Sequence, residues 1–378
     1  MSKVKNWHLK REVEYPYDES RPKKQWAIIF DLNKCIACQT CTLACKTTWT
    51  SGKGQEYMFW NNVESKPYGG YPLAWDLRVL EKLGRQEWSE KGEYLGKTLI
   101  EASPAHERVL HFAPTDEDWM YPNVGEDDCA GAKVEGGGHI GALPHDKWFF
   151  YLPRTCAHCT YPACLAACPR KAIYKRPEDG IVLIDQTRCK GYGECVRACP
   201  YKKSMYNPHT RTSEKCVGCY PAVEQGIQPQ CVVNCIGKIR VMGFVSPEGK
   251  ARDDNPIDFL VHKLGLALPY YPQFGTEPNI YYIPPIHADR EYLKQMFGPK
   301  VEAAIEKYKK LADDPVAHGL LCLIGSSDRI IHRFAVDKGV AAGFDEAGAE
   351  IVRVPVVEAV IERAAYDAKI GAIRNNTP

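Results

Sequence analysis

Cysteine spacing constrains this chain more than any other feature. Fifteen of its seventeen cysteines fall into four short runs, all printed in the sequence. They are Cys35-x2-Cys38-x2-Cys41-x3-Cys45, Cys156-x2-Cys159-x4-Cys164-x3-Cys168, Cys189-x5-Cys195-x3-Cys199 and Cys216-x2-Cys219-x11-Cys231-x3-Cys235. Runs one, two and four match bacterial iron–sulfur spacing closely or with one widened gap, and run three matches it with one ligand missing. The pattern predicts iron–sulfur clusters.

The spacing also predicts which cysteines share a cluster. In such runs the first three cysteines wrap one cluster, whereas the fourth begins a helical turn and binds the neighbouring cluster. Runs two and three therefore pair, and runs one and four, which lack nearby partners, are joined by the same rule. The predicted sets are site 1 (Cys35, Cys38, Cys41, Cys235), site 2 (Cys45, Cys216, Cys219, Cys231), site 3 (Cys156, Cys159, Cys164, Cys199) and site 4 (Cys168, Cys189, Cys195). We expect them to form a row in that order.

Site 4 has one cysteine fewer than the others. Tyr192 stands where run three lacks its second cysteine, and three thiolates suit a cluster that is missing one iron. We therefore predict [4Fe-4S] clusters at sites 1, 2 and 3 and a [3Fe-4S] cluster at site 4. Gly191 and Gly193, which have no Cβ, are expected to let the backbone approach the sulfides closely.

Two other uses of the cysteines fit the sequence poorly. A disulfide framework is typical of short secreted chains with an even cysteine count, and zinc usually takes two separated CxxC pairs, which only run four resembles. Cys129 and Cys322 lie outside the runs and are predicted to be a surface thiol and a core thiol. His158 and Tyr161 are predicted to pack and to donate or accept hydrogen bonds rather than to carry electrons.

Composition narrows the function further. The chain has 378 residues, enough for two or three domains, and a net charge of +2 that does not suggest nucleic-acid binding. No apolar stretch of about 18 residues predicts a membrane span, and the N-terminus lacks a signal-peptide pattern. Between Pro169 and Cys216, eleven basic residues stand against five acidic ones. This segment is either a solvated basic face or a source of positive charge that raises cluster potentials.

The order of the runs predicts an α+β fold of two pseudo-symmetric bacterial-ferredoxin modules, one split by the other. The predicted parts are an N-terminal arm (1–24), a split module (25–50 and 205–250), an insertion (51–150), a central module (151–204) and a helical C-terminal clamp (251–378). The polar arm is expected to extend and grip a partner.

Local patterns predict individual elements within these parts. Strands are expected at 25–32, 108–113, 147–152 and 238–244, with a hairpin at 171–185 whose turn is 176–180. Helices are expected at 40–49, 257–266, 288–311 and 356–369.

Longer phrases resemble one known family, the four-cluster β subunits of the complex iron–sulfur molybdoenzymes, in the dimethyl-sulfoxide-reductase superfamily. The resemblance runs from about residue 25 to residue 285, and Tyr192 stands where respiratory nitrate reductase β subunits usually have tryptophan at their three-iron cluster. The phrases at 31–41 (DLNKCIACQTC), 54–64 (GQEYMFWNNVE), 66–72 (KPYGGYP) and 167–181 (ACPRKAIYKRPEDGI) are most similar to nitrite oxidoreductase β subunits. The phrase at 274–285 (FGTEPNIYYIPP) is similar to the perchlorate, chlorate, selenate and dimethyl-sulfide members.

The resemblance implies an electron-transfer subunit without a substrate site of its own. It implies an α subunit with a molybdenum bis-pterin centre facing site 1, and a haem b γ subunit or cytochrome c acceptor facing site 4. It also implies folded co-export to the periplasm with α, the cytoplasmic face of the membrane being the alternative. The substrate is expected to be nitrite or nitrate, with perchlorate, chlorate, selenate, dimethyl sulfide or ethylbenzene as alternatives. A free polyferredoxin is the competing hypothesis, and the long insertion and tail oppose it.

Overall fold

A four-stranded sheet stands at the centre of the computed structural model, which describes residues 2–17, 21–67, 69–119, 148–356, 365–369 and 371–374. Its strand order is β10-β3-β12-β11. The strands are β3 (Gln25–Asp31), β10 (Arg240–Val245), β11 (Leu268–Pro269) and β12 (Ile280–Ile283). β10 runs antiparallel and β12 parallel to β3. This places the strand before run one beside the strand after run four.

Every residue of β3 is buried, because both faces of the sheet are covered. Successive side chains of a strand point to opposite faces. Accordingly Ile28 and Phe30 belong to one hydrophobic cluster, while Ala27 and Ile29 belong to another. The first cluster reaches the cysteine-bearing elements and the insertion, and the second includes apolar residues of the C-terminal region.

The cysteine runs lie on short helices and the loops before them. α1 (Thr40–Trp49) carries Cys41 and Cys45 of run one and packs against α6 (Gln230–Val233), and α5 (Tyr220–Val223) precedes α6. α3 (Ala163–Ala167) packs against α4 (Glu194–Ala198). Two hairpins accompany them, β6 (Ile173–Lys175) with β7 (Val182–Ile184) and β8 (Ser204–Asn207) with β9 (Thr212–Lys215). The predicted helix at 40–49 and the hairpin within 171–185 are confirmed.

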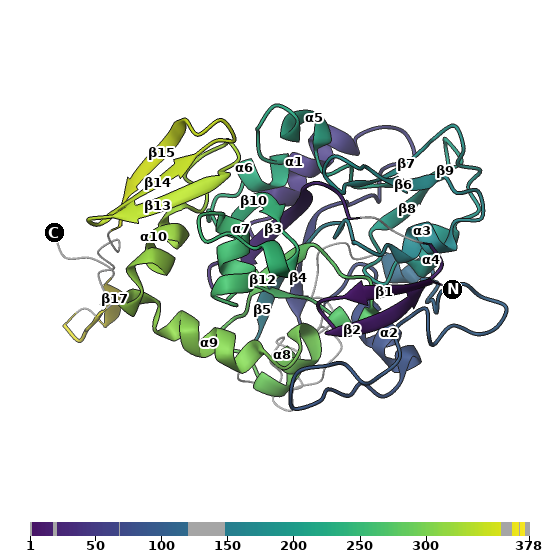
Figure 1. Cartoon of the computed structure of the whole chain (residues 1–378), viewed down its shortest axis with the longest axis horizontal. Helices are drawn as coiled ribbons and strands as arrows, with labels where there is room; N and C mark the ends of the chain where they lie inside the picture. Colours follow the sequence, from purple (N-terminus) through teal and green to yellow (C-terminus); the bar gives the residue numbers. More distant parts are fainter. Residues whose placement is uncertain are drawn as a thin grey trace.

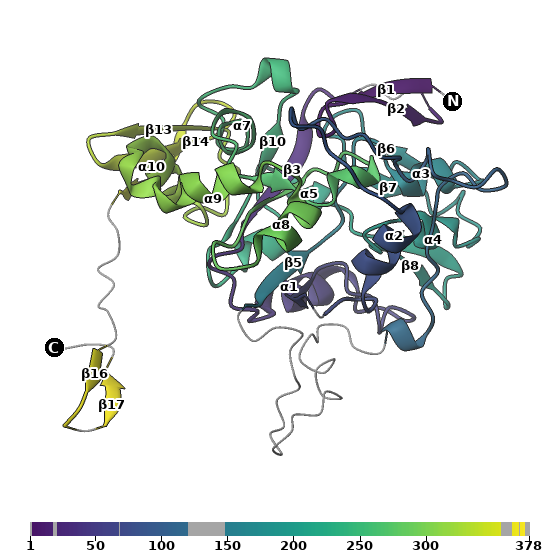
Figure 2. The same cartoon turned by 90° about the horizontal axis from the view of Figure 1, so that it is seen from below.

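Figure 1 shows how these elements are arranged. The elements of runs two and three lie toward one end of the molecule, the C-terminal sheet lies at the other, and α1, α5 and α6 lie between them. The view from below in Figure 2 keeps α3 and α4 on the side away from the C-terminal sheet. Together the elements form the α+β fold that the sequence predicts.

The insertion contributes a strand, a helix and part of the main core. β4 (Asn62–Lys66) pairs antiparallel with β5 (Phe150–Arg154), and α2 (Trp75–Leu83) follows β4. The predicted strand at 147–152 is therefore shifted, and residue 147 lies outside the described residues. The predicted strand at 108–113 is wrong: those residues form irregular backbone. Val109 and Phe112, three positions apart, are the buried residues there, which is not the period of two that a strand needs.

The N-terminal arm is a folded hairpin rather than an extended segment. β1 (Ser2–Asn6) pairs antiparallel with β2 (Arg11–Tyr15). The hydroxyl of Tyr15 donates to the Pro162 carbonyl oxygen at 3.0 Å, and that of Tyr161 donates to the Lys5 carbonyl oxygen at 2.8 Å. Val4, Val13 and Tyr15 are buried. The expectation of an extended arm is thus wrong for these residues, because alternating side chains bury against this chain itself; contact of the arm with a partner stays a prediction.

The C-terminal region differs most from its prediction. Its helices are α7 (Pro256–Asp258), continued by a π-helix (Phe259–Lys263), then α8 (Arg290–Phe297), α9 (Val301–Lys309) and α10 (Pro315–Leu323). The predicted helix at 288–311 is two helices, because Gly298 adopts a φ of 80° after α8 and Pro299 follows it.

A three-stranded sheet also replaces part of the expected helical clamp. β13 (Arg333–Asp337), β14 (Val340–Phe344) and β15 (Glu350–Pro355) form an antiparallel meander packed on α10. The predicted helix at 356–369 is wrong at its end, where β16 (Ala365–Asp367) pairs with β17 (Ala372–Arg374). Residues 357–364 of that prediction lie outside the described residues.

Candidate metal centres

Site 1 gathers its four cysteines around one cavity. Cys35, Cys38, Cys41 and Cys235 line it, although Cys235 is about two hundred residues from the others. The loop between β3 and α1 wraps the cavity through two left-handed residues, Ala37 and Gln39 (φ 53° and 58°). Burial raises the pKa of the Cys35 thiol to about 11, and Cys41 and Cys235 add to that rise. The four thiols therefore lie close together.

Site 3 is a second cavity of the same kind. Cys156, Cys159, Cys164 and Cys199 line it, with Lys203 and Lys215. All four cysteines are buried. Burial raises the pKa of the Cys164 thiol well above its ordinary value, and Cys199, Cys156 and Cys159 raise it further.

At sites 2 and 4, the predicted ligands lie close enough for neighbouring thiols to raise one another's pKa. At site 2, burial raises the pKa of the Cys45 thiol well above its ordinary value. The nearby thiols of Cys216, Cys231 and Cys219 raise it further. For site 4, burial raises the pKa of the Cys195 thiol to about 11, and Cys168 and Cys189 contribute. The structure thus places the cysteines of each predicted set near one another, and the assignment of each set to one cluster stays a prediction.

Neighbouring sites also adjoin one another. Cys41 of site 1 raises the pKa of the Cys231 thiol of site 2, after burial and the other site 2 thiols. Cys156 of site 3 likewise raises the pKa of the Cys216 thiol of site 2. Cys199 of site 3 raises the pKa of the Cys195 thiol of site 4. These neighbours agree with the predicted order 1, 2, 3, 4, which stays a prediction.

Polar hydrogens point at several of the sulfur atoms. Four backbone N–H groups and one indole N–H donate to a cysteine Sγ at 3.2–3.4 Å: Ala172 to Cys168, Lys203 to Cys199, Ser213 to Cys189, Gly218 to Cys216, and Trp49 Nε1 to Cys219. Hydrogen bonds of this kind stabilise a thiolate more than a thiol. They suit sulfur atoms that bind iron, and they are one means of setting a cluster's potential.

Buried cations accompany the cysteines. Arg240 lies beside site 1, while Lys203 and Lys215 line the cavity of site 3, and all three are almost completely buried. Burial lowers the pKa of Lys203 to about 7, whereas at Lys215 burial is outweighed by Cys156 and Cys164, which raise its pKa. None of the three forms an ion pair with a carboxylate in the part of the chain that the structure describes. A buried charge is costly unless it is paired. An iron–sulfur cluster held by four thiolates is anionic, so thiols and cations together fit such a group. When bound, the clusters supply one-electron oxidation and reduction.

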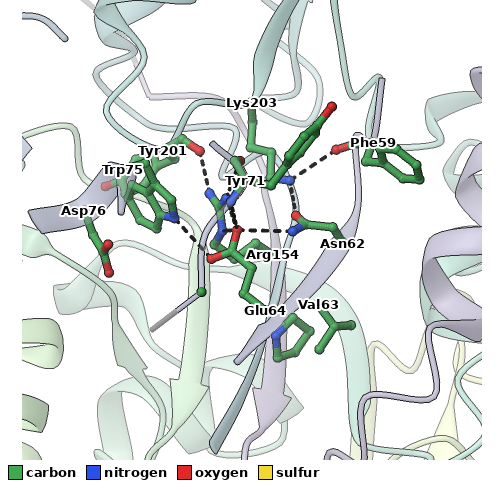
Figure 3. A network of polar contacts seen from close by, with 12 residues as sticks. Phe59, Asn62, Val63, Glu64, Tyr71, Trp75, Asp76, Arg154, Tyr201 and Lys203 are labelled. Carbon is green, nitrogen blue, oxygen red and sulfur yellow. Dashed lines mark hydrogen bonds and ion pairs between the residues drawn. The ribbon is translucent and has the colours of Figure 1, made fainter. Parts of the chain in front are cut away.

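A separate network of paired charges links the insertion to site 3 (Figure 3). Arg154 Nε donates to Glu64 Oε1 at 2.7 Å, and Arg154 Nη1 donates to the Tyr201 carbonyl oxygen at 2.6 Å. Trp75 Nε1 donates to Glu64 Oε2 at 3.1 Å. Burial opposes ionisation of Glu64, yet Arg154 and Lys66 hold its pKa at about 2. The network fastens β4 and β5 next to the chain that carries Cys199.

Comparison with known proteins decides the family. The 4Fe-4S dicluster domain family matches residues 147–245. The chain is 43% identical to the selenate reductase subunit beta of Thauera selenatis, over 75% of this chain and 89% of that protein. It is 41% identical to the dimethylsulfide dehydrogenase subunit beta of Rhodovulum sulfidophilum, over 76% and 90%, and 41% identical to the respiratory nitrate reductase subunit beta of Haloferax mediterranei, over 76% and 85%. The chain belongs to the β subunits of the dimethyl-sulfoxide-reductase-type molybdoenzymes.

This β subunit is an electron-transfer component of an oxidoreductase complex, as the spacing and the resemblance predict. It carries clusters of the 4Fe-4S type, and its family implies a catalytic α partner. No helix among the described residues is long and apolar enough to cross a membrane.

Tyr192 is 60% exposed and precedes α4 in the β subunit. Gly191 and Gly193 beside it both adopt positive φ, 69° and 74°. A Cβ on Gly191 would lie 2.3 Å from the Arg211 carbonyl oxygen, whereas one on Gly193 would meet nothing within 4 Å. The close approach at Gly191 is therefore to the backbone after β8, which was not foreseen. A cluster at site 4 with Tyr192 in place of a fourth cysteine stays a prediction.

The remaining predicted residues of the β subunit have structural surroundings. His158 is buried, and its Nδ1 accepts from the Val182 N–H at 3.0 Å while its ring contacts that of Trp26. Its packing and hydrogen bonding are confirmed, as is the hydrogen bond of Tyr161. Cys322 is half-buried on α10, and Cys129 lies outside the described residues.

Sequence reasoning offered the basic segment as a source of positive charge for the clusters, but it did not predict which cations of the β subunit are buried. Lys203 and Lys215 belong to the basic segment between Pro169 and Cys216, and neither lies on a solvated face. Arg240 was counted only as part of a strand. A signal was available in each case, because all three stand within four residues of a cysteine or inside an otherwise apolar strand.

Proposed function

We propose that this β subunit conducts single electrons through three [4Fe-4S] clusters at sites 1, 2 and 3 and one [3Fe-4S] cluster at site 4. The observation that carries the proposal is the adjacency of the sites, each influencing the next through one pair of thiols. The residues of this chain hold the clusters, exclude water from sites 2 and 3, and donate hydrogen bonds to their sulfur atoms. The same pairing of runs supports two ferredoxin modules, one split by the other.

Iron and sulfide content tests the cluster set. The purified complex, corrected for the iron of its other subunits, should contain about fifteen irons in this chain, from three four-iron clusters and one three-iron cluster. The oxidised protein should show the EPR signal of a three-iron cluster. Absence of that signal with about sixteen irons would contradict the assignment of site 4, and zinc in place of iron would contradict the whole proposal.

Site 1 is proposed to face the molybdenum-bearing α subunit. Three large apolar side chains near its cysteines are exposed: Ile36 by 66%, Leu43 by 61% and Ile236 by 63%. Cys38 is exposed as well. Apolar side chains gathered at a redox site suit a surface that a partner protein covers. At the other end, site 4 is proposed to face a haem b γ subunit or a cytochrome c.

The substrate of the complex is proposed to be nitrite or nitrate. The phrases at 54–64, 66–72 and 167–181 support this choice, since they resemble nitrite oxidoreductase β subunits. The selenate, dimethyl-sulfide and nitrate relatives, at 41–43% identity, support the clan as a whole. Perchlorate, chlorate, selenate, dimethyl-sulfide and ethylbenzene enzymes are the other outcomes. Mass spectrometry of the large subunit that copurifies, with oxidation of nitrite and reduction of nitrate assayed on the complex, decides among them.

The resemblance also supports co-export with α to the periplasm, with the cytoplasmic face of the membrane as the alternative. Protease accessibility of the complex in spheroplasts separates the two positions. Migration of this chain as a monomer on gel filtration of native extract would favour a free polyferredoxin instead.

A further inference from the structure

The geometry points to Arg240 as a fixed cation shared by sites 1 and 2, which raises the reduction potentials of both clusters. The inference rests on the proposed clusters at these sites and adds the residue that sets their potentials. Arg240 is the first residue of β10, and its side chain is buried against the loop of run one.

The guanidinium of Arg240 touches site 1 directly. Its Nη2 lies 2.7 Å from the Sγ of Cys41, and its Nη1 donates to Asn61 Oδ1 at 3.0 Å. The ring of Phe30 lies below the cation, 4.8 Å from its central carbon. The group is thus held by the sulfur atom of a predicted ligand, an amide oxygen and an aromatic face.

The same cation also acts on site 2. α6, which carries Cys231 of site 2, packs against β10, the strand that Arg240 begins. The same helix packs against α1, which carries Cys41 of site 1. Arg240 therefore lies where the two predicted clusters come nearest.

The charge of Arg240 is not cancelled by any carboxylate in the described part of the chain. Arg154 offers the contrast: it is equally buried, but it is bound by the carboxylate of Glu64. An arginine stays protonated in proteins, and in a poorly polarisable interior its field is weakly screened. Adding an electron to either neighbouring cluster adds negative charge next to this cation. Reduction of both clusters is favoured for that reason.

The test compares four variants in the assembled complex. Arg240→Gln removes the charge, and Arg240→Lys keeps it. Asn61→Asp leaves Arg240 in place and sets a carboxylate against its Nη1. Because Asn61 Nδ2 has no hydrogen-bond partner among the described residues, the change to Asp should lose no contact there. Lys34→Gln removes a cation that also lies beside site 1 but is 53% exposed.

EPR-monitored redox titration gives the decisive readout. In Arg240→Gln and in Asn61→Asp, the equilibrium constants for reducing two of the four clusters should fall at least tenfold, which is about 59 mV for one electron. The other two clusters serve as internal references and should not move. Arg240→Lys should stay near the native potentials, and Lys34→Gln should shift them much less, because water screens its charge.

The outcomes separate the inference from the function beneath it. Full iron loading with unchanged potentials in Arg240→Gln or Asn61→Asp overturns the role of Arg240 and leaves the electron-transfer proposal intact. If Arg240→Gln does not assemble, Asn61→Asp alone decides, since it retains the arginine. Absence of iron and sulfide from the native chain would instead defeat the proposed function.

Discussion

The two ends of the row of sites are built differently. Site 1 has four cysteines, a buried unpaired cation and three exposed apolar side chains around it. Site 4 has three cysteines and exposed Tyr192. The residues that flank its cysteines in sequence include five exposed basic ones: Arg170, Lys171, Arg188, Lys190 and Arg197.

The contrast teaches that one chain can present two kinds of surface to two partners. An apolar surface around a cluster favours a permanent partner, because covering it removes apolar area from water. A basic surface instead attracts acidic partners at a distance and allows them to leave. This difference supports the proposal that the catalytic subunit covers site 1 and that an exchangeable or acidic acceptor approaches site 4.

Removing a cysteine should have the largest effect on the comparison. Cys235→Ser should remove the site 1 cluster, so that iron content falls by about four per chain and electrons no longer pass from the α subunit. Iron analysis and single-turnover kinetics measure both effects. Cys322→Ser is the matched control, since that cysteine lies on α10 outside the sites. Equal iron loss in the two variants would contradict the ligand sets.

Carboxylates placed on the apolar surface around site 1 should have the second-largest effect. Ile36→Glu combined with Ile236→Glu should abolish copurification of the large subunit while leaving the iron content of the β subunit unchanged. The reason is that burying two carboxylates at an interface without partners is costly. Pull-down with a tagged β subunit measures it. Leu95→Glu, at an equally exposed leucine in the insertion, should have no such effect.

The packing of β4 and β5 between sites 1 and 4 depends on the buried network around Glu64. Glu64→Gln leaves Arg154 and Lys66 without their shared carboxylate, and it should cost about 3–5 kcal/mol of unfolding free energy in urea at pH 7. Because the folded pKa of about 2 lies below the ordinary 4.5, this stabilisation is present above pH 4.5 and is lost as pH falls toward 2.

The difference between native protein and Glu64→Gln should therefore shrink below pH 4.5. Glu87→Gln, at a half-exposed glutamate paired with an exposed arginine, should change stability by less than about 1 kcal/mol. A constant gap between native and Glu64→Gln protein from pH 7 to pH 3 would show that this carboxylate does not titrate as described.

Making site 4 resemble site 1 tests the three-iron prediction. Tyr192→Cys should add one iron and abolish the three-iron EPR signal. It should also lower the potential of that cluster, because another thiolate adds negative charge. Tyr192→Phe is the control and should leave the cluster unchanged. An unaltered spectrum in Tyr192→Cys would place residue 192 away from the cluster.

The sequence allowed a fuller prediction of the cysteine sets than of the C-terminal region, for a physical reason. A cluster demands thiols at fixed short spacings, so the sets that include Cys235 and Cys199 could be read from the runs alone. The sheet β13–β15 carries no such constraint, and its turn Lys338-Gly339, with φ of 48° and 74°, lacks the Asn-Gly or Asp-Gly sequence that signals such a hairpin. Arg240 was missed because its role depends on which residues the fold places beside it.

The basic surface at site 4 should show the smallest effect. Lys171→Gln combined with Lys190→Gln should slow electron transfer from the reduced complex to ferricyanide, an anionic oxidant, severalfold at low ionic strength. The difference should disappear near 1 M salt, where screening acts within about 3 Å. Stopped-flow mixing measures the rates, and Lys338→Gln, an exposed lysine at the C-terminal sheet, is the matched control. Equal slowing by Lys338→Gln would mean that net charge, and not the site 4 surface, steers the oxidant. Slowing that occurs only in the Lys171→Gln, Lys190→Gln double variant would identify site 4 as the place where electrons leave. Only at that site would the positive field of these two lysines act on the anionic oxidant as it accepts the electron.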